Sequence, residues 1–306
     1  MSVINTNISA LYAQSALTVN NRVMSANMQQ LSTGSKINSA KDDAAGLAIT
    51  QNMTSQIRGL NQAVRNANDG VSLLQTADGA LVEASNMLQR MRELSVQSAS
   101  GTLSDVQRGY LNTEFTNLSS QIGKIASETV WNGKQILNAS TVSSTGGDAS
   151  TAVTYASIAS SADVSTSVAA SAATVYDTYT FQTGQSAAQT ITVQIAAMDV
   201  RGLGLTGMSI STLGAGSAAI SKLDTALASV NGQRATLGAV TNRLTYAADN
   251  MTNISTNIAA SRSQITDTDY AQASSQLARN QIIQQAATAM LAQANQQPQS
   301  VLALLK

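Results

Sequence analysis

Residues 3–31 read VINTNISALYAQSALTVNNRVMSANMQQL, a stretch in which Arg22 is the one charged side chain. Its apolar side chains recur four and three residues apart in two groups: Ile4, Ile8 and Leu11, then Met24, Met28 and Leu31. This spacing predicts an apolar stripe along one helix, with a slip of phase between the two groups near residues 15–17. The opposite face carries amides and hydroxyls, where a surface helix of a monomer usually carries charges. We therefore predict that this helix is buried in a larger assembly.

The other end of the chain has the same uncharged character. Residues 273–306 carry Arg279 and Lys306 as their only charges, and an apolar stripe recurs at helical spacing along them. Two uncharged amphipathic helices at opposite ends of one chain are predicted to pair and to pack against other copies. The residues predicted to drive this self-assembly are Ile4, Ile8, Leu11, Met24, Met28, Leu31, Leu277, Ile283 and Met290.

Long helices are also predicted between the two ends. One heptad pattern runs from Leu74 to Met91, a second from Leu111 to Ile125, and the longest from Ile220 to Ile265. Alternating apolar and polar residues on both sides of 184–189 predict a β-hairpin. Residues 141–174 are rich in Ser, Thr and Ala and have no clear period, which is typical of a loosely specified insertion.

These patterns predict a mainly α fold. Its N- and C-terminal segments form a long antiparallel coiled coil and helical bundle, with a small β-hairpin region and a short variable insertion in the middle. We predict a terminal coiled-coil domain (1–44 plus 262–306), a helical bundle domain with the hairpin (45–140 plus 175–261) and an outer insertion (141–174).

Composition excludes several classes of function. The 306 residues have a formal net charge of zero, so no basic surface for nucleic acid is expected. No run of 18 apolar residues occurs, so no membrane insertion is expected, and the first residues lack the pattern of a cleaved signal peptide. Cysteine and histidine are absent, which removes thiol nucleophiles, imidazole bases and nearly all zinc sites. We therefore predict no enzyme, no catalytic residue, no cofactor and no metal.

Three local motifs have a structural and a functional interpretation. Residues 202–207 fit the dinucleotide pattern G-x-G-x-x-G, but no alternating β and α segments surround them, which favours a flexible link. The aspartate pairs at 42–43 and 267/269 are interpreted as helix-end residues rather than metal ligands. Arg234 and Arg262 interrupt the longest heptad pattern. They either extend from the bundle edge or fix its register by pairing with a carboxylate such as Glu83 or Glu114.

Five stretches of the chain resemble bacterial flagellin: MSVINTNISALYAQ (1–14), LSTGSKINSAKDDAAGLAI (31–49), LQRMRELSVQSASGT (88–102), VNGQRATLGAVTNRL (230–244) and AQANQQPQSVLALL (292–305). The resemblance implies a structural subunit that polymerises into the extracellular flagellar filament used for motility. It also implies secretion without a cleaved signal peptide. The implied partners are the flagellar export apparatus with a chaperone, hook-associated junction and cap proteins, and further copies of the chain. The alternative is a hook–filament junction protein, which the strength of the matches at 88–102 and 292–305 argues against.

The helix predicted around Leu74–Met91 carries one further candidate surface. At 100° per residue, Arg90, Leu94 and Gln97 point away from its apolar stripe, so Leu94 is expected to be an exposed apolar residue. A scattered surface leucine would be ordinary. The resemblance implies more, because seven residues here match the flagellin surface that the vertebrate Toll-like receptor for flagellin binds: Leu88, Gln89, Arg90, Arg92, Leu94, Gln97 and Glu114.

Overall fold

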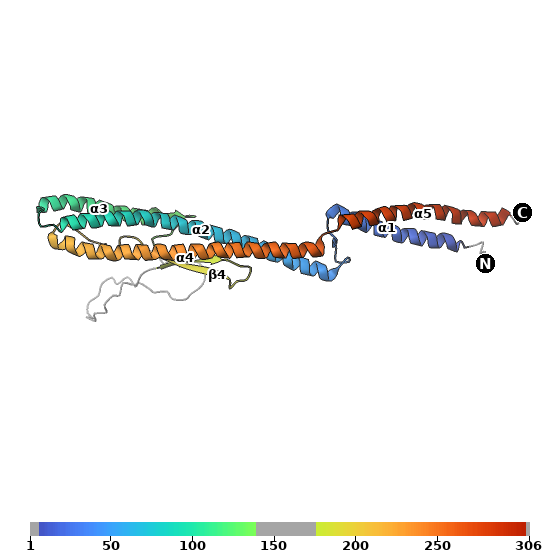
Figure 1. Cartoon of the computed structure of the whole chain (residues 1–306), viewed down its shortest axis with the longest axis horizontal. Coiled ribbons are helices and arrows are strands. Elements are labelled where there is room, and N and C mark those ends of the chain that lie inside the picture. The colour runs from blue at the N-terminus through green and yellow to red at the C-terminus, as the bar shows by residue number, and fades with distance from the viewer. Residues whose placement is uncertain (1–5, 139–175, 304–306) are drawn as a thin grey trace, which may run out of the picture. The chain divides into compact units, whose positions relative to one another are not determined.

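A computed structural model describes residues 6–138 and 176–303 (Figure 1). Its elements in chain order are α1 (Ile8–Thr33), α2 (Ala44–Ser98), α3 (Asp105–Glu128), β1 (Val130–Trp131), β2 (Lys134–Gln135), β3 (Tyr176–Gln182), β4 (Thr190–Ala196), α4 (Leu213–Thr266) and α5 (Tyr270–Ala303). The predicted mainly α fold with a small antiparallel hairpin is confirmed. The predicted insertion at 141–174 lies outside the described residues, as does Ile4. None of the described helices combines the length and hydropathy needed to span a bilayer.

The chain packs into two compact units. Unit 1 comprises Met1–Asn61 and Thr252–Lys306, and unit 2 comprises Gln62–Met251. The long helices α2 and α4 contribute to both units. The limit on α2 therefore lies after the predicted limit at 44, and the limit on α4 lies before the predicted limit at 262. The predicted limits of the domains remain a proposal.

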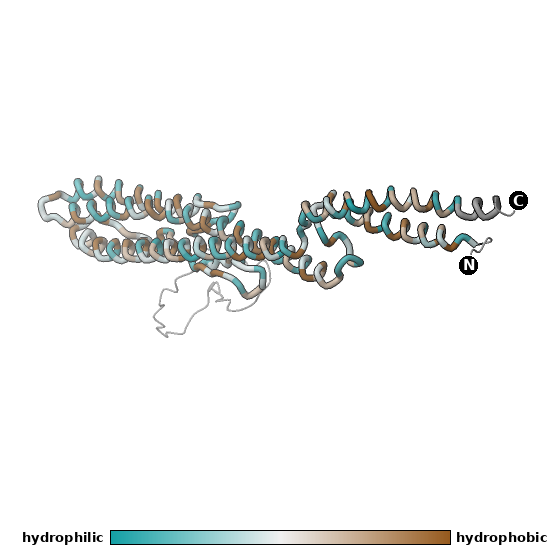
Figure 2. Tube along the Cα trace, turned by 45° about the vertical axis from the view of Figure 1, so that its right-hand side comes forward, coloured by the Kyte–Doolittle hydropathy of each residue, from teal (hydrophilic) through white to brown (hydrophobic). Residues whose placement is uncertain are grey.

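Unit 2 is a helical bundle in which α2 lies between α3 and α4 (Figures 1 and 2). Apolar residues recur along each of these helices, as the heptad patterns predict (Figure 2). Their buried side chains include Leu74, Leu81, Leu88 and Met91 of α2, Phe115 and Ile122 of α3, and Leu223, Val230, Leu237 and Leu244 of α4. Because α2 packs on two sides, it buries a face wider than one heptad stripe.

The turn from α2 to α3 is held by local hydrogen bonds. Ser104 and Gln107 form a capping box at the start of α3, as their spacing predicts. Arg108 is buried and donates from Nε to the Ser98 carbonyl at 3.0 Å and from Nη2 to the Ser100 carbonyl at 2.9 Å. Its Nη1 also pairs with Asp105 at 3.0 Å. Arg108 therefore satisfies the carbonyl of the last residue of α2, which has no partner within the helix, and a carbonyl of the following turn.

Two antiparallel hairpins complete the described part of unit 2. β3 pairs with β4 from Tyr176↔Ala196 to Gln182↔Thr190, which confirms the predicted hairpin. Gln233 of α4 fastens β4 to the bundle, because its Nε2 donates to the Gln194 carbonyl at 2.9 Å and its Oε1 accepts from the Ala196 amide at 3.4 Å.

The link from β4 to α4 consists of turns. Gly204 and Gly207 have φ of 68° and 69°, in the left-handed region that glycine adopts without strain. The following helix, α4, begins at Leu213, beyond the glycine motif, and neither described sheet contains parallel strands. The dinucleotide interpretation of residues 202–207 is therefore excluded.

In unit 1, α1 packs antiparallel along α5 (Figure 1). Amide side chains join the two helices. Asn7 Nδ2 donates to the Ala294 carbonyl at 2.7 Å, and Asn20 Nδ2 donates to the Asn280 carbonyl at 2.9 Å. Gln284 Nε2 donates to Asn21 Oδ1 at 3.1 Å. The predicted pairing of the two terminal helices is thus present within a single chain.

Candidate assembly surface and receptor face

The face that α1 turns toward α5 is not the apolar stripe that the sequence predicts. Its less exposed positions include an unbroken series spaced three and four residues apart, with Asn21 and Gln30 beside it: Ala10, Ala13, Leu17, Asn20, Met24, Asn27 and Leu31. Met24 and Leu31 belong to this set, but Ile8, Leu11 and Met28 are 49%, 57% and 50% exposed. The prediction of a single stripe is therefore wrong. The slip of phase arises because the two groups of apolar residues lie largely on different faces of the helix.

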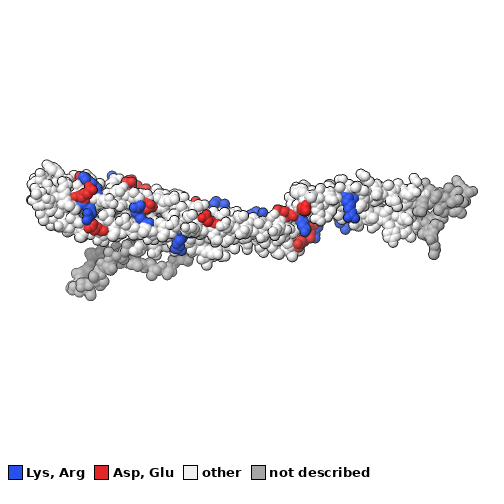
Figure 3. Space-filling model, in the orientation of Figure 1, with Lys and Arg blue, Asp and Glu red and all other residues white. Residues whose placement is uncertain are grey.

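The outer faces of α1 and α5 are unusually apolar for exposed surface. The exposed large side chains are Ile8, Leu11, Tyr12, Val19, Val23 and Met28 on α1 and Tyr270, Ile282, Ile283 and Met290 on α5. The view in Figure 3 shows mostly uncharged surface over these two helices. Of the predicted assembly residues, Ile283 and Met290 are exposed, whereas Leu277 lies half-buried on the side that faces α1. Exposed apolar faces of this extent are typical of interaction surfaces.

The predicted receptor face on α2 contains exposed polar residues linked by ion pairs. Gln89, Arg90, Arg92 and Gln97 are exposed. Arg90 Nε lies 2.9 Å from Glu114 Oε1 of α3, and its Nη1 lies 3.0 Å from Glu93 Oε2. The hydrogen bond to Glu114, and then that to Glu93, raise the pKa of Arg90. Charges of both signs alternate on this part of unit 2 (Figure 3).

A second ion pair links the same stretch of α2 to the helix on its other side. Arg92 Nε lies 2.6 Å from Asp224 Oδ1 of α4. This hydrogen bond raises the pKa of the Arg92 guanidinium. Arg90 and Arg92 therefore tie α2 to α3 and α4 respectively, while the side chains of both arginines remain about half exposed.

Two residues assigned to the receptor face are buried instead. Leu88 is 0% exposed and Leu94 is 1% exposed, so the prediction that Leu94 is an exposed apolar residue is wrong. The prediction assumed that α2 buries one stripe, but α2 packs against both α3 and α4, and Leu94 falls within the wider buried face. The apolar residues Met87, Leu88, Met91 and Leu94 together span this width, and that cluster is the signal in the sequence that could have revealed it.

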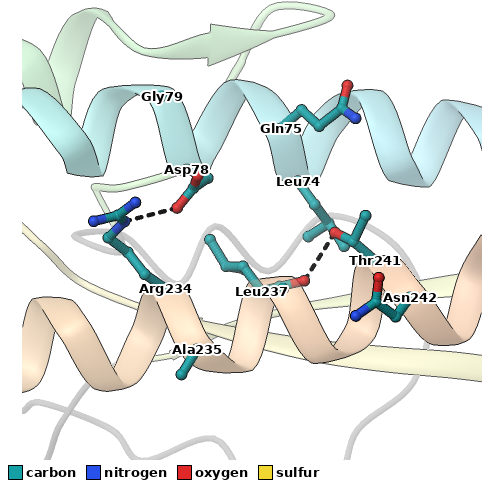
Figure 4. A pocket seen from close by; sticks show the side chains of 10 residues that line it. Leu74, Gln75, Asp78, Gly79, Arg234, Ala235, Leu237, Thr241 and Asn242 are labelled. Atoms are coloured by element: carbon teal, nitrogen blue, oxygen red, sulfur yellow. Dashed lines mark hydrogen bonds and ion pairs between the residues drawn. The ribbon is translucent and has the colours of Figure 1, made fainter.

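The two arginines in the heptad pattern of α4 have different partners from those predicted. Arg234 Nε lies 2.9 Å from Asp78 Oδ1 across a shallow groove between α2 and α4, so neither Glu83 nor Glu114 is its partner (Figure 4). Gly79 and Gly238 also line the groove. Arg262 Nη1 donates to Thr54 Oγ1 at 3.3 Å.

The aspartates near helix boundaries accept hydrogen bonds from local groups. Asp43 Oδ1 accepts from the Gly46 amide at 2.9 Å at the start of α2, and Asp269 Oδ1 accepts from the Ala271 amide at 2.9 Å at the start of α5. Hydrogen bonds from Ser39 and from Ser263 lower the pKa values of Asp42 and Asp267. Asp43 and Asp269 therefore act at the starts of helices, as the helix-end interpretation predicts, and the described residues contain no cluster of three metal-ligating side chains.

Known proteins match this chain over most of its length. The model of the bacterial flagellin N-terminal helical region matches residues 4–142, and the model of the bacterial flagellin C-terminal helical region matches residues 220–305. The "Polar flagellin F" of Vibrio parahaemolyticus is 35% identical over 372 aligned positions, covering 99% of both chains. The "Flagellar filament 33 kDa core protein" of Treponema phagedenis is 40% identical over 305 positions, covering 99% of this chain and 100% of that protein.

A solved structure is also similar. The crystal structure of Bacillus cereus flagellin has 30% identity and a TM-score of 0.46, and covers 65% of this chain and 94% of that one. The matches to both helical regions of flagellin, whose terminal helices pair in the fold, define a structural filament protein rather than an enzyme. The chain belongs to the bacterial flagellin family, and it is a subunit of the extracellular flagellar filament.

Proposed function

We propose that the chain polymerises through the outer faces of α1 and α5. The observation that carries this proposal is the row of exposed apolar side chains on both helices, with few charges near them. Contact with neighbouring copies would bury this surface, and each Å² of apolar area removed from water contributes roughly 25 cal/mol. Contacts between different patches on successive copies do not close a ring, and they extend as a helical filament.

Assembly and folding of unit 1 are coupled in this proposal. Short helices are marginally stable in water unless an apolar face is packed. The surface between α1 and α5 consists largely of alanines and amides, so much of its stability would come from neighbouring copies.

Charges on the outer face of α1 are expected to abolish polymerisation. Val19 and Val23 are exposed and lie on successive turns. The variant Val19→Asp/Val23→Asp should stay monomeric after salting-out, because burying an unpaired carboxylate between copies costs several kcal/mol. Negative-stain electron microscopy and pelleting measure the result. The matched control Val19→Ile/Val23→Ile should form filaments, and filaments of the charged variant at the normal protein concentration would contradict the proposal.

The same salting-out experiment separates the filament subunit from the junction-protein alternative. A junction protein joins two structures and does not extend by itself, whereas a filament subunit forms long polymers from the pure chain. We also propose that the export apparatus with its chaperone, and the junction and cap proteins, act on this chain, with no cleaved signal peptide. Both proposals rest on the family resemblance.

We further propose that the monomer is recognised by the vertebrate Toll-like receptor for flagellin. The contact residues are the exposed members of the predicted set, Gln89, Arg90, Arg92 and Gln97, together with the half-buried Glu114 that pairs with Arg90. Leu88 and Leu94 shape this face from below, since both are buried. The side chain of Arg90 supports a central role, because Glu114 and Glu93 hold its guanidinium at the surface, and arginine is enriched among residues that dominate binding.

Replacing Arg90 by alanine is expected to weaken receptor binding. The loss should be at least about 1–2 kcal/mol, which is roughly a 5- to 30-fold rise in Kd. Titration of monomer on receptor-reporter cells and direct binding to the receptor ectodomain measure it. Arg65→Ala is the matched control, because Arg65 is also exposed on α2 and bonds only to its neighbour Gln62. If Arg90→Ala signals at the same concentration as Arg65→Ala, the proposed face is wrong.

A further inference from the structure

The seam between α1 and α5 is built from two matching heptad series. On α1 the series is the one already given, from Ala10 to Leu31, and on α5 it comprises Ala273, Leu277, Asn280, Gln284, Ala287, Leu291 and Ala294. Both series alternate spacings of three and four residues without interruption. Such a seam repeats every heptad, so sliding one helix by one heptad brings seam residues against seam residues again.

The observed register is defined by contacts along the whole pair. Asn7 meets Ala294, Asn20 meets Asn280, and the Tyr270 hydroxyl donates to the Leu31 carbonyl at 3.3 Å. In this register Met24 faces Leu277, and Asn27 faces Ala273.

Asn27 does not fit this register well. It is 5% exposed, and its Nδ2 has no hydrogen-bond partner. An unsatisfied buried amide is unfavourable, because it has lost its hydrogen bonds to water without replacing them. The facing residue, Ala273, has no side-chain acceptor to offer.

A second register lies one heptad away, a slide of about 10 Å at 1.5 Å per residue. It would bring Asn27 opposite Asn280, where Asn20 now bonds, and Asn20 opposite Ala287. In each register, one of the two asparagines has a hydrogen-bond partner across the seam and the other has none. The second register also brings Leu31 opposite Leu277 and Leu17 opposite Leu291. The second register loses the hydrogen bond from Gln284 to Asn21 but gains these two leucine pairs, so the seam by itself distinguishes the two registers only weakly.

A separate element, at the base of the pair, does distinguish them. The loop after α1 and the connector from α4 to α5 form an isolated antiparallel bridge between Ser35 and Asp267. The Lys36 amide donates to the Thr266 carbonyl at 2.6 Å, and the Thr268 amide donates to the Gly34 carbonyl at 3.0 Å. We call this bridge the clasp. A slide of about 10 Å would break every one of these bonds.

We propose that the clasp selects the register of α1 on α5, and that opening the clasp lets the pair occupy a second register one heptad away. The clasp thus acts as a conformational latch on the helices that carry the assembly surface. This inference concerns packing within one chain, so it does not depend on which copies the outer faces contact.

The absence of cysteine from the sequence allows a direct test by cross-linking. Met24→Cys/Leu277→Cys reports the observed register, and Leu31→Cys/Leu277→Cys reports the second one. Both pairs share one site and leave all the asparagines in place. Each is made in the full chain and treated with a short bis-thiol-reactive linker, and the intrachain product is quantified by gel mobility and peptide mass.

The clasp is opened in two ways. Lys36→Pro/Thr268→Pro removes both backbone donors of the clasp. The milder Ser35→Ala/Lys36→Pro removes one backbone donor and the side-chain hydrogen bond from Ser35 to Thr266, and it leaves the seam contacts unchanged. With the clasp intact, we expect the 24–277 product. With either opened clasp, the 31–277 product should rise at least about tenfold as the population shifts.

Three outcomes would overturn the proposal. Equal yields of both products with the intact clasp would mean that the clasp selects nothing. The 24–277 product alone with both opened clasps would mean that the seam fixes the register. Loss of both products would mean that the helices separate instead of sliding. A mixture of single-cysteine chains, one with Met24→Cys and one with Leu277→Cys, identifies products formed between chains.

Discussion

A chain that lacks residues 1–32 is expected to remain a soluble monomer under conditions in which the full chain polymerises. The deletion removes nearly all of α1 and with it half of the exposed apolar surface of unit 1. It also leaves α5 without the helix that it packs against, and a lone helix is marginal in water. The deletion thus removes the assembly surface of α1 and also the packing that supports α5. We therefore expect polymerisation to be abolished, and not merely to need a higher protein concentration.

Unit 2 should be unaffected by this deletion, since it comprises only Gln62–Met251. Circular dichroism should show a loss of helix that corresponds to unit 1 and an unchanged main thermal transition. Sedimentation and electron microscopy report the assembly state, with the full chain as the control. Filaments formed by the shortened chain would disprove a role for α1 in polymerisation.

Leu94→Ala is expected to destabilise unit 2 by about 2–5 kcal/mol, because it leaves a cavity beneath the proposed receptor face. The side chain is 1% exposed between helices that are packed on both sides of α2. Val96 lies two residues away on the same helix and is 50% exposed, which makes Val96→Ala a matched control. That control should change stability by roughly 0.5 kcal/mol or less. Urea unfolding followed by circular dichroism measures both.

This pair of variants also bears on receptor recognition. If the Leu94→Ala variant is partly unfolded and activates the receptor poorly, the loss of activation reflects the altered shape of the receptor face and not the loss of a direct contact with Leu94. An equal effect of the two substitutions on stability would contradict the buried position of Leu94.

The local features of this fold could be predicted from sequence because short-range spacing determines them. The heptads around Leu81 and Ile122, the capping box at Ser104 and the hairpin at 184–189 each depend on residues close together in the chain. Pairing of α1 with α5 could also be predicted, since both ends lack charge.

The errors concern features that depend on how many neighbours a helix has and where they lie. Spacing along α2 predicts Leu94 on the surface, because it does not reveal a second packing partner. Spacing along α1 predicts Ile8 and Leu11 in one stripe with Met24, although asparagines line the seam with α5. The partner of Arg234 depends on the register between α2 and α4, and the residue spacing within either helix does not specify that register.

The amide of Gln233 has a consequence for how the hairpin behaves at high protein concentration. It donates to the carbonyl of Gln194 and accepts from the amide of Ala196, the residues on either side of Ile195. A residue of a parallel strand lying opposite Ile195 would make the same two hydrogen bonds with its backbone. The side chain thus imitates a peptide group and occupies part of the free edge of β4. Unpaired strand edges recruit strands from other molecules. A glutamine on the adjacent helix therefore helps to protect a filament subunit from a competing route through β-sheet aggregation.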